Sequence, residues 1–377
     1  MDHLQQRFKV TYSYPVFFTN NLFEHSNKCL SNFLSSQADP YRKKILVILD
    51  ANVKDHHAGL AEHITNYLRC LPGFELVPEI VTPSGGEAVK NDFSLFFNLV
   101  TKIDKYALDR HSFVIAIGGG SLLDLVGFIS AISHRGLKHI RIPTTVLSQA
   151  DSGVGVKNGI NFQEKKNFLG SFMPPSAVFN DFTFLTTLER RDWRSGMAEA
   201  VKVALIKDVD FFKWITKRAT ILSGRDMPAM KQLIQQSAKL HLRHIGKSGD
   251  PFESSSFRPL DFGHWSAHKL EQLTSFKLRH GEAVSIGIAL DSCYSYLLGW
   301  LRQEELESII KVLKTLQLPL FHPLLDSSQV RKGLDEFRQH LGGQLSIPLL
   351  RAIGRSEDVH EINEKLLDQA VKMCKTL

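Results

Sequence analysis

The chain has 377 residues, of which 43% are hydrophobic and 23% are charged, as is usual for a globular protein with room for two domains. Its formal net charge is +7, but it has no dense run of lysine and arginine. The composition therefore disfavours nucleic acid as a partner and fits an anionic small substrate. The four cysteines are widely separated and form no CxxC pair. This spacing argues against a thiolate metal site and a disulfide framework, and it predicts a cytoplasmic, reducing environment.

The first half of the chain alternates short apolar runs with amphipathic stretches. Its first five residues carry no signal-peptide pattern. The longest apolar run, 113–132, contains three consecutive glycines and Asp124, so it predicts a strand, a turn and a helix rather than a membrane span. The alternation predicts a parallel sheet covered by helices over residues 1–187. Strands are expected at 44–50, 75–81, 113–117 and 139–143, and helices at 57–71, 89–106 and 122–132.

From about Thr186 the pattern changes to long amphipathic segments. A helical period sustained over such lengths predicts a second, mostly α-helical domain over residues 188–377. The segments cover 192–206, 210–223, 228–246, 263–273, 281–298 and 303–315.

Three histidines lie close together in this second half. His264 and His268 are four residues apart, so they share one face of a helix, and His280 follows within twenty residues. Imidazoles with a carboxylate such as Glu199 are typical ligands of a divalent metal. Two alternatives stay open: histidines that only pack or face solvent, and an exposed ion pair between Glu199 and Lys202, which are three residues apart.

Two stretches of the first half are suited to phosphate. Gly118-Gly119-Gly120-Ser121 follows a predicted strand and opens a helix, where glycines let backbone N–H groups approach a pyrophosphate. Residues 151–159 and Lys165-Lys166-Asn167 offer ammonium and amide donors. Asp50, at the end of the first strand, is suited to accept from a ribose or adenine. A turn without ligand, a solvated loop and a helix-capping Asp are the structural alternatives.

Taken in chain order, these segments resemble the 3-dehydroquinate synthase-like sugar phosphate cyclases, and the likeness covers roughly residues 45–355. The resemblance implies an N-terminal Rossmann-like α/β domain that binds NAD, a C-terminal helical metal domain and a homodimer. The matching segments are the glycine turn, Thr144-Thr145, Asp151 to Lys157, Lys166-Asn167, Glu199 to Lys202, Gly263-His264 to His268, and His280-Gly281-Glu282.

The resemblance also implies a role for each matching residue. Glu199, His264 and His280 are expected to hold a divalent ion, zinc or cobalt. Arg135 is expected to reach the phosphate site of the partner subunit. The implied catalytic residues are Asp151, Lys157, Lys202 and His268, and the implied substrate contacts are Arg135, Asn167, Asp261 and Arg338. The implied NAD contacts are Asp50, Asn52, Glu87, Lys90, Gly119, Gly120, Asp124, Thr144, Thr145, Lys166, Phe184, Thr187 and Asp192.

The implied reaction is that of a carbon–oxygen lyase acting on a phosphate. NAD transiently oxidises a ring alcohol while the metal polarises its oxygen; phosphate is eliminated, the hydride returns, and an intramolecular aldol step closes a carbocycle. Lys157, Lys202 and Asn167 are expected to hold the phosphate. Asp151, or a water held by His268, is expected to accept the alcohol proton.

The chain departs from 3-dehydroquinate synthases just before the first metal histidine. Where those enzymes carry Arg-x-x-x-Asn-x-Gly-His, this chain has Phe257 and Asp261. Losing the guanidinium that binds the substrate carboxylate costs about 2–5 kcal/mol. Arg-Pro-x-Asp-Phe-Gly-His resembles instead the 2-epi-5-epi-valiolone synthase branch, which cyclises the non-carboxylated sedoheptulose 7-phosphate. The next residues, with the insert at 248–253, are similar to cyclase-like proteins of ebo-type clusters.

Two further residues or segments differ from the sequence motifs of the families that the chain resembles. The 2-epi-5-epi-valiolone synthase branch often replaces the second histidine with proline, and here His268 is retained. The family's Asp-Lys-Lys phosphate segment is replaced by Phe337-Arg338-Gln339-His340, so Arg338 or His340 is expected to take its place. The alternatives are a 3-dehydroquinate synthase acting on the carboxylated heptulosonate phosphate, a metal-dependent alcohol or glycerol dehydrogenase, and a non-catalytic binding protein.

Overall fold

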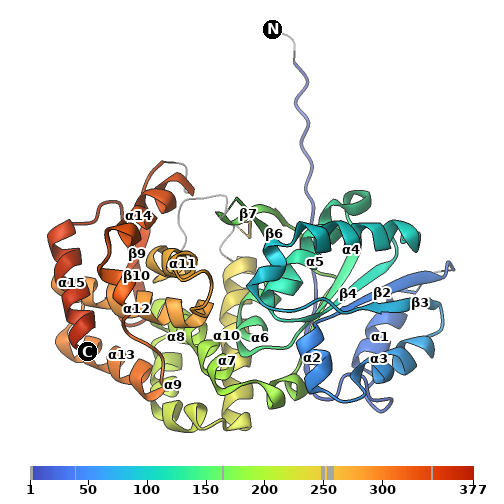
Figure 1. Ribbon diagram of the computed structural model, residues 1–377, viewed down its shortest axis with the longest axis horizontal. Coiled ribbons are helices and arrows are strands. Elements are labelled where there is room, and N and C mark those ends of the chain that lie inside the picture. Colours follow the sequence, from blue (N-terminus) through green and yellow to red (C-terminus); the bar gives the residue numbers. More distant parts are fainter. Residues whose placement is uncertain (1–2, 39, 164, 248–250, 253–258, 341–342) are drawn as a thin grey trace.

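A six-stranded parallel sheet forms the N-terminal half of the chain (Figure 1). The computed structural model describes residues 3–38, 40–163, 165–247, 251–252, 259–340 and 343–377. The strand order is β1-β8-β5-β4-β2-β3, and every pairing in this sheet is parallel. The strands are β1 (Val16–Thr19), β2 (Lys43–Leu49), β3 (Phe74–Val81), β4 (Phe113–Gly118), β5 (Lys138–Pro143) and β8 (Ala177–Asp181).

The alternation of side chains along β2 explains why helices cover both faces of the sheet. Ile45, Val47 and Leu49 pack with buried residues of α1 (Cys29–Ser36) and α3 (Leu60–Arg69). Leu46 and Ile48 point to the opposite face and pack with α4 (Phe93–Lys105) and α5 (Gly120–Ile132). A strand buried on both faces reads as a continuous apolar run, which is why it was recognisable in the sequence.

The C-terminal half is mostly helical, as the sequence predicts, and its buried residues form one large cluster. A short hairpin, β9 (Ile347–Ala352) and β10 (Arg355–Val359), lies within it and was not predicted. The helices are α7 (Arg190–Ser195), α8 (Met197–Lys207), α9 (Val209–Ser223), α10 (Met227–Lys247), α11 (His264–Leu273), α12 (His280–Leu297), α13 (Gln303–Thr315), α14 (Ser328–His340) and α15 (Glu364–Thr376).

Two details bear on the predicted organisation. The stretch 151–159, which reads as a glycine-rich loop, contains the short helix η3 (Ser152–Val154) and runs into an antiparallel hairpin, β6 (Lys157–Phe162) and β7 (Lys165–Phe172). Because residues 153–156 are buried, the solvated-loop alternative is wrong. Val146 and Ala150 of α6 (Val146–Ala150) pack in the cluster of the helical half. The domain boundary between residues 187 and 188 stays a prediction. Among the described residues, no helix has both the length and the apolar character needed to cross a membrane.

Candidate metal and cofactor site

Glu199, His264 and His280 come together in the helical half of the chain. Glu199 lies on α8, and the two histidines are the first residues of α11 and α12. The three ligand atoms all lie within 4.8 Å of one another. The Nε2 atoms of His264 and His280 are 3.4 Å and 3.2 Å from Glu199 Oε1. Segments more than sixty residues apart in the chain thus converge on one point.

The other nitrogen of each ring is also engaged, and this makes the set suited to a divalent ion. His264 Nδ1 lies 3.0 Å from the carbonyl oxygen of Phe262, and His280 Nδ1 lies 3.0 Å from Glu271 Oε2. When Nδ1–H donates to these oxygens, each Nε2 keeps its lone pair for a metal. Two imidazoles and one carboxylate match the three protein ligands of a catalytic zinc site, so the residues fit such an ion.

Lys202 pairs with Glu199 inside the protein. Its Nζ is 2.5 Å from Glu199 Oε2, and the two side chains are 3% and 1% exposed. The alternative of a surface ion pair is therefore wrong. Burial alone would raise the pKa of Glu199, but Lys202 and His264 outweigh it and hold that pKa well below the usual range. Burying a lysine and a carboxylate is costly, which favours a functional reason for the pair.

Glu271 connects the metal residues to the N-terminal half. Its Oε2 faces His280, and its Oε1 lies 2.6 Å from Nζ of Lys166 on β7. Burial would raise the pKa of Glu271, but Lys166 and His280 lower it. Glu271 has no role in the sequence prediction. Its position seven residues after His264 and three after His268 puts it on the same helix face, and that spacing is the signal that was missed.

His268 stands beside the metal residues rather than among them. Its ring centroid is 5.3 Å from that of His264 and 6.1 Å from that of His280. Burial, with Lys166 and His264 nearby, holds the pKa of His268 well below its usual range, so the ring is neutral at pH 7. A neutral imidazole can hold a water or accept a proton. His268, Glu271 and His280 also form a second group of possible ligand atoms.

Asp151 has a partner that the sequence did not indicate. His241, on α10, places Nδ1 2.7 Å from Asp151 Oδ1. Burial raises the pKa of Asp151, but the nearby His241 outweighs it and leaves that pKa lowered. Ninety residues separate the two side chains, and no short-range pattern marks His241.

The start of α11 is held in place by two hydrogen bonds to Asp291 of α12. Its carboxylate accepts from the backbone N–H of Gly263 and from Trp265 Nε1, each over 2.9 Å. Gly263 has φ +76°, and a Cβ there would lie 2.8 Å from the backbone nitrogen of Ile288, so only glycine fits. Burial raises the pKa of Asp291 to about 7. His264, the next residue, is therefore placed by a buried anchor.

The predicted NAD residues gather at the carboxyl ends of the strands. Gly118 ends β4, Gly119 is the N-cap of α5, and no side chain caps that helix. The N–H groups at the start of α5, those of Gly120 and Ser121, are therefore suited to an anion such as a pyrophosphate, whereas the N–H of Leu122 donates to Gly119 O. Thr144 N donates to Gly118 O over 3.0 Å, and Thr145 caps α6. This edge is where open α/β sheets bind nucleotides, so the residues present fit the cofactor.

Other predicted cofactor residues form one polar network. Lys90 is buried, lies 2.8 Å from Asp124 Oδ2 and donates to Asn167 Oδ1. Glu87 accepts from Ser121 Oγ over 2.6 Å, and burial, which would raise its pKa, is outweighed by Lys90 and Lys166.

The remaining cofactor residues are each tied to a neighbour. Asp50 caps α2 (Ala51–His56) by accepting from the N–H of Asn52, so the capping alternative is correct in that respect; burial raises the pKa of Asp50. His57 packs edge-on against Phe184 with 5.2 Å between ring centroids, and its Nε2 is 2.9 Å from Thr187 Oγ1.

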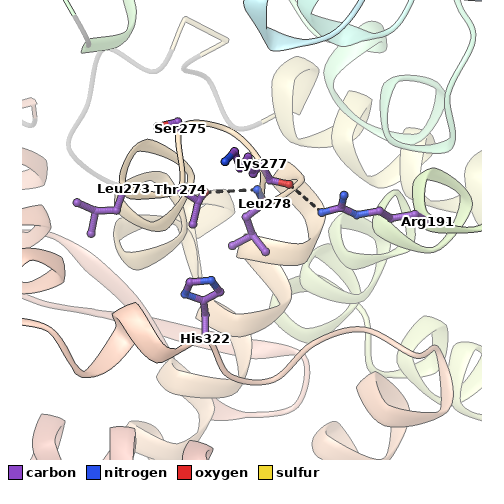
Figure 2. A pocket seen from close by; sticks show the side chains of 7 residues that line it. All are labelled: Arg191, Leu273, Thr274, Ser275, Lys277, Leu278 and His322. Carbon is purple, nitrogen blue, oxygen red and sulfur yellow. Dashed lines mark hydrogen bonds between the residues drawn. The ribbon is translucent and has the colours of Figure 1, made fainter.

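Loop 274–279 leads into His280 and is held by a cation on α7. Arg191 donates to the carbonyl oxygen of Lys277 over 2.8 Å and pairs with Glu282 over 2.6 Å. Figure 2 shows this arginine pointing at the loop across a small hollow that contains none of the predicted site residues. Arg279, in the same loop, pairs with Asp192 over 3.0 Å.

Several predicted substrate residues face outward. Arg135 is exposed in the short turn η2 (Ser133–Arg135), and Arg338 is exposed on α14, where it pairs with Asp335. Among the described residues, neither arginine forms an ion pair with the metal or cofactor residues. Lys157 is exposed at the start of β6, and Asp261 is half-buried in η5 (Pro259–Asp261). Phe257 and the side chain of His340 lie outside the part of the chain that the structure describes.

Comparison with known proteins identifies the family. Residues 80–195 match the 3-dehydroquinate synthase N-terminal family, and residues 196–338 match the 3-dehydroquinate synthase C-terminal family. The chain is 31% identical to a 2-epi-5-epi-valiolone synthase of Streptomyces hygroscopicus subsp. jinggangensis over 95% of this chain and 86% of that one. It is 34% identical to a 3-dehydroquinate synthase of Thermodesulfovibrio yellowstonii, over 77% of this chain and 80% of the other.

A solved structure agrees with these matches. The 2-epi-5-epi-valiolone synthase from the same Streptomyces, with NAD+ and Zn2+ bound, superposes with a TM-score of 0.89, 29% identity and 99% coverage of both chains. The predicted fold class, a parallel-sheet α/β half followed by a mostly helical half, is confirmed. The chain belongs to the 3-dehydroquinate synthase family of sugar phosphate cyclases.

Proposed function

We propose that this chain is an NAD- and divalent-metal-dependent sugar phosphate cyclase that converts a non-carboxylated ketose phosphate of the sedoheptulose 7-phosphate class to a carbocycle, with loss of phosphate. The observation that carries the proposal is the convergence of Glu199, His264 and His280, with the buried Lys202 beside Glu199. The relatives named above include a protein of this activity with NAD+ and Zn2+ bound. By reaction type the enzyme is a carbon–oxygen lyase, and its four free cysteines suit a cytoplasmic location.

When bound, a zinc or cobalt ion would supply a Lewis acid and NAD would supply reversible hydride transfer, which side chains cannot provide. The chain's own residues then bind, orient and move protons. Glu199, His264 and His280 would hold the ion. The N–H groups of Gly120 and Ser121 at the start of α5, with Thr144, Thr145 and the network around Lys90, would hold the dinucleotide.

The residues suited to transfer protons lie near Glu199, His264 and His280. Asp151, with His241 2.7 Å away, is an ionised carboxylate next to an imidazole and is suited to accept a proton from a substrate hydroxyl. His268 is neutral and can hold a water. Lys202 remains charged, since nearby Glu199 and Asp151 outweigh the burial that lowers its pKa and leave that pKa raised.

The residues suited to bind the substrate phosphate are two lysines, two arginines and the amide of Asn167. Lys157 and Asn167 sit on the β6–β7 hairpin, and Lys202 approaches from α8. In the proposed homodimer, Arg135 would act across the interface on the partner's phosphate site, and Arg338 would supply a further charge. Ammonium and guanidinium groups suit an anion of this kind.

Asp261 carries the substrate choice. A carboxylate at this position would accept from a hydroxyl and repel a carboxylated sugar, because like charges in a half-buried site are unfavourable. The test supplies sedoheptulose 7-phosphate and the carboxylated heptulosonate phosphate separately and measures phosphate release and product mass. Turnover of the carboxylated sugar alone would replace the proposal with a 3-dehydroquinate synthase. Net accumulation of NADH without phosphate release would indicate a dehydrogenase.

A further inference from the structure

The first residues of the chain form an extended arm. Residues 3–13 are all exposed and belong to no helix or strand, and Figure 1 shows the N-terminal segment running straight out from the body. The arm is anchored at its base, where the hydroxyl of Tyr14 donates to the carbonyl of Val154 over 2.7 Å. The chain then enters β1, the edge strand of the main sheet.

The arm has the sequence of an amphipathic strand. Leu4, Phe8, Val10 and Tyr12 occupy even positions, and their side chains are 102%, 80%, 61% and 57% exposed. The odd positions from His3 to Ser13 are polar or charged throughout, and Gln6 is the single polar residue on the apolar side. A strict period of two gives a strand one apolar face. Such a face in water marks a surface that a partner covers.

A matching surface lies on the body of the same chain. Five aromatic rings form a ridge across α4, β6 and β7, with neighbouring centroids 5.2 to 6.5 Å apart: Phe97, Phe96, Phe93, Phe162 and Phe168. Phe97 and Phe168, at its two ends, are 63% and 55% exposed. Beside the ridge, β7 pairs only with β6 among the strands of the described residues, so its outer edge can accept another strand.

The arm leaves the body next to this edge. The ring of Tyr12 is 5.9 Å from that of Phe252, which is 5.4 Å from that of Phe172 at the end of β7. In a two-fold dimer that joined these regions, each arm base would lie beside the partner's β7, and the exchange would be reciprocal. An extended segment from Tyr12 to His3 spans roughly 30 Å, enough to follow β7 along its length.

We propose that residues 3–13 of one subunit add as a strand along β7 of a second copy of this chain and cover the partner's aromatic ridge. The inference rests on the proposed homodimer and extends it, because the exchanged strand lies on the hairpin that carries Lys157, Lys166 and Asn167. One subunit's arm thereby steadies the other's cofactor and phosphate residues.

A photo-crosslink tests where the arm lies. Phe8 is replaced by p-benzoylphenylalanine, which keeps an aromatic side chain on the arm, and the full-length protein is irradiated. We expect a covalent dimer whose crosslinked peptide contains residues 165–172 or 93–97. A crosslink confined to one chain, or no covalent dimer from a protein that sedimentation shows to be dimeric, overturns the arm proposal and leaves the dimer intact. A protein that is monomeric at roughly 50 µM overturns both the arm proposal and the homodimer.

A matched pair of variants tests which face of the arm binds. Phe8→Glu with Val10→Glu places two charges on the apolar face, and Gln5→Glu with Thr11→Glu places the same two charges on the polar face. By analytical ultracentrifugation we expect the dimer dissociation constant to rise at least about tenfold in the first variant and to change less than about twofold in the second. Equal effects would mean that charge, not docking, weakens the dimer, and would contradict the proposal.

Discussion

The metal residues and the outward-facing cations of this chain are held in opposite ways. Glu199, His264 and His280 are fixed by partners before any ligand arrives, through Lys202, the carbonyl of Phe262, and Glu271. Arg135 and Arg338 are exposed, and the only ion pair described for either is a surface pair within α14. The chain therefore preorganises the residues that would hold the metal, and it leaves the contacts to an anionic substrate to be completed on binding.

Removing the central carboxylate is expected to have the largest effect. Glu199→Ala deletes one of three ligands and leaves Lys202 buried without its partner, so we expect metal affinity to fall more than about 100-fold and turnover to be lost. Metal content by mass spectrometry after dialysis is the measurement, and NAD binding by fluorescence should persist. Glu304→Ala, on the surface of α13, is the control. Loss of NAD binding as well would mean that the two groups of residues are not independent.

Loosening the support behind His280 is expected to have the next largest effect. Glu271→Gln keeps the shape of the side chain but weakens its bond to His280 Nδ1, so metal affinity should fall about 10–100-fold. Chelator competition gives the affinity, and the visible spectrum of the cobalt-loaded protein reports the ligand geometry. Glu336→Gln, which loses the pair with Lys269 instead, should leave both unchanged. An unchanged spectrum in Glu271→Gln would make Glu271 a structural residue only.

The pKa of His280 predicts a proton released on metal binding. Burial would lower this pKa, but Glu271 and Glu199 outweigh it and raise the value to about 9 in the protein without metal. At pH 7 the ring is therefore protonated and must lose its proton to become a ligand, so affinity should rise up to about tenfold per pH unit until pH 9. Calorimetry in two buffers of different ionisation enthalpy should show about one proton released per metal. No release at pH 7 would place the pKa near its ordinary value.

The smallest effect is expected at an exposed cation. Arg338→Ala removes a pair with Asp335 on the surface of α14, which contributes about 0.3–0.5 kcal/mol to stability at most. Steady-state kinetics should show the Michaelis constant for the sugar phosphate raised less than about fivefold with kcat unchanged. A loss of kcat beyond about 100-fold would show that Arg338 reaches the reacting phosphate. The exposed arginines would then be as essential to turnover as the preorganised metal residues.

The sequence predicted the central strands and the metal residues for definite physical reasons. Strands such as β2 are buried on both faces and read as apolar runs, and His264 and His268 share a helix turn, so local spacing marked the strands and the histidine cluster. The choice of Glu199, His264 and His280 as the ligand set came from the family resemblance. The β6–β7 hairpin read as a loop, because its glycines and lysines hide a strand period. His241 was missed because its partner Asp151 is ninety residues away. Contacts of that range leave no pattern in a single sequence.

Asp291 makes the position of the metal residue His264 independent of the substrate-facing residue Asp261. It holds Gly263 and Trp265 on either side of His264, while Asp261 lies just outside this anchor in η5. A substitution at position 261 thus alters the half-buried surface offered to a sugar. It does not move the imidazole of His264, which would hold the metal. Under the proposed function, single substitutions at position 261 can change the substrate that the enzyme accepts. Because each of these substitutions keeps the metal site intact, selection acts on an enzyme that is still active.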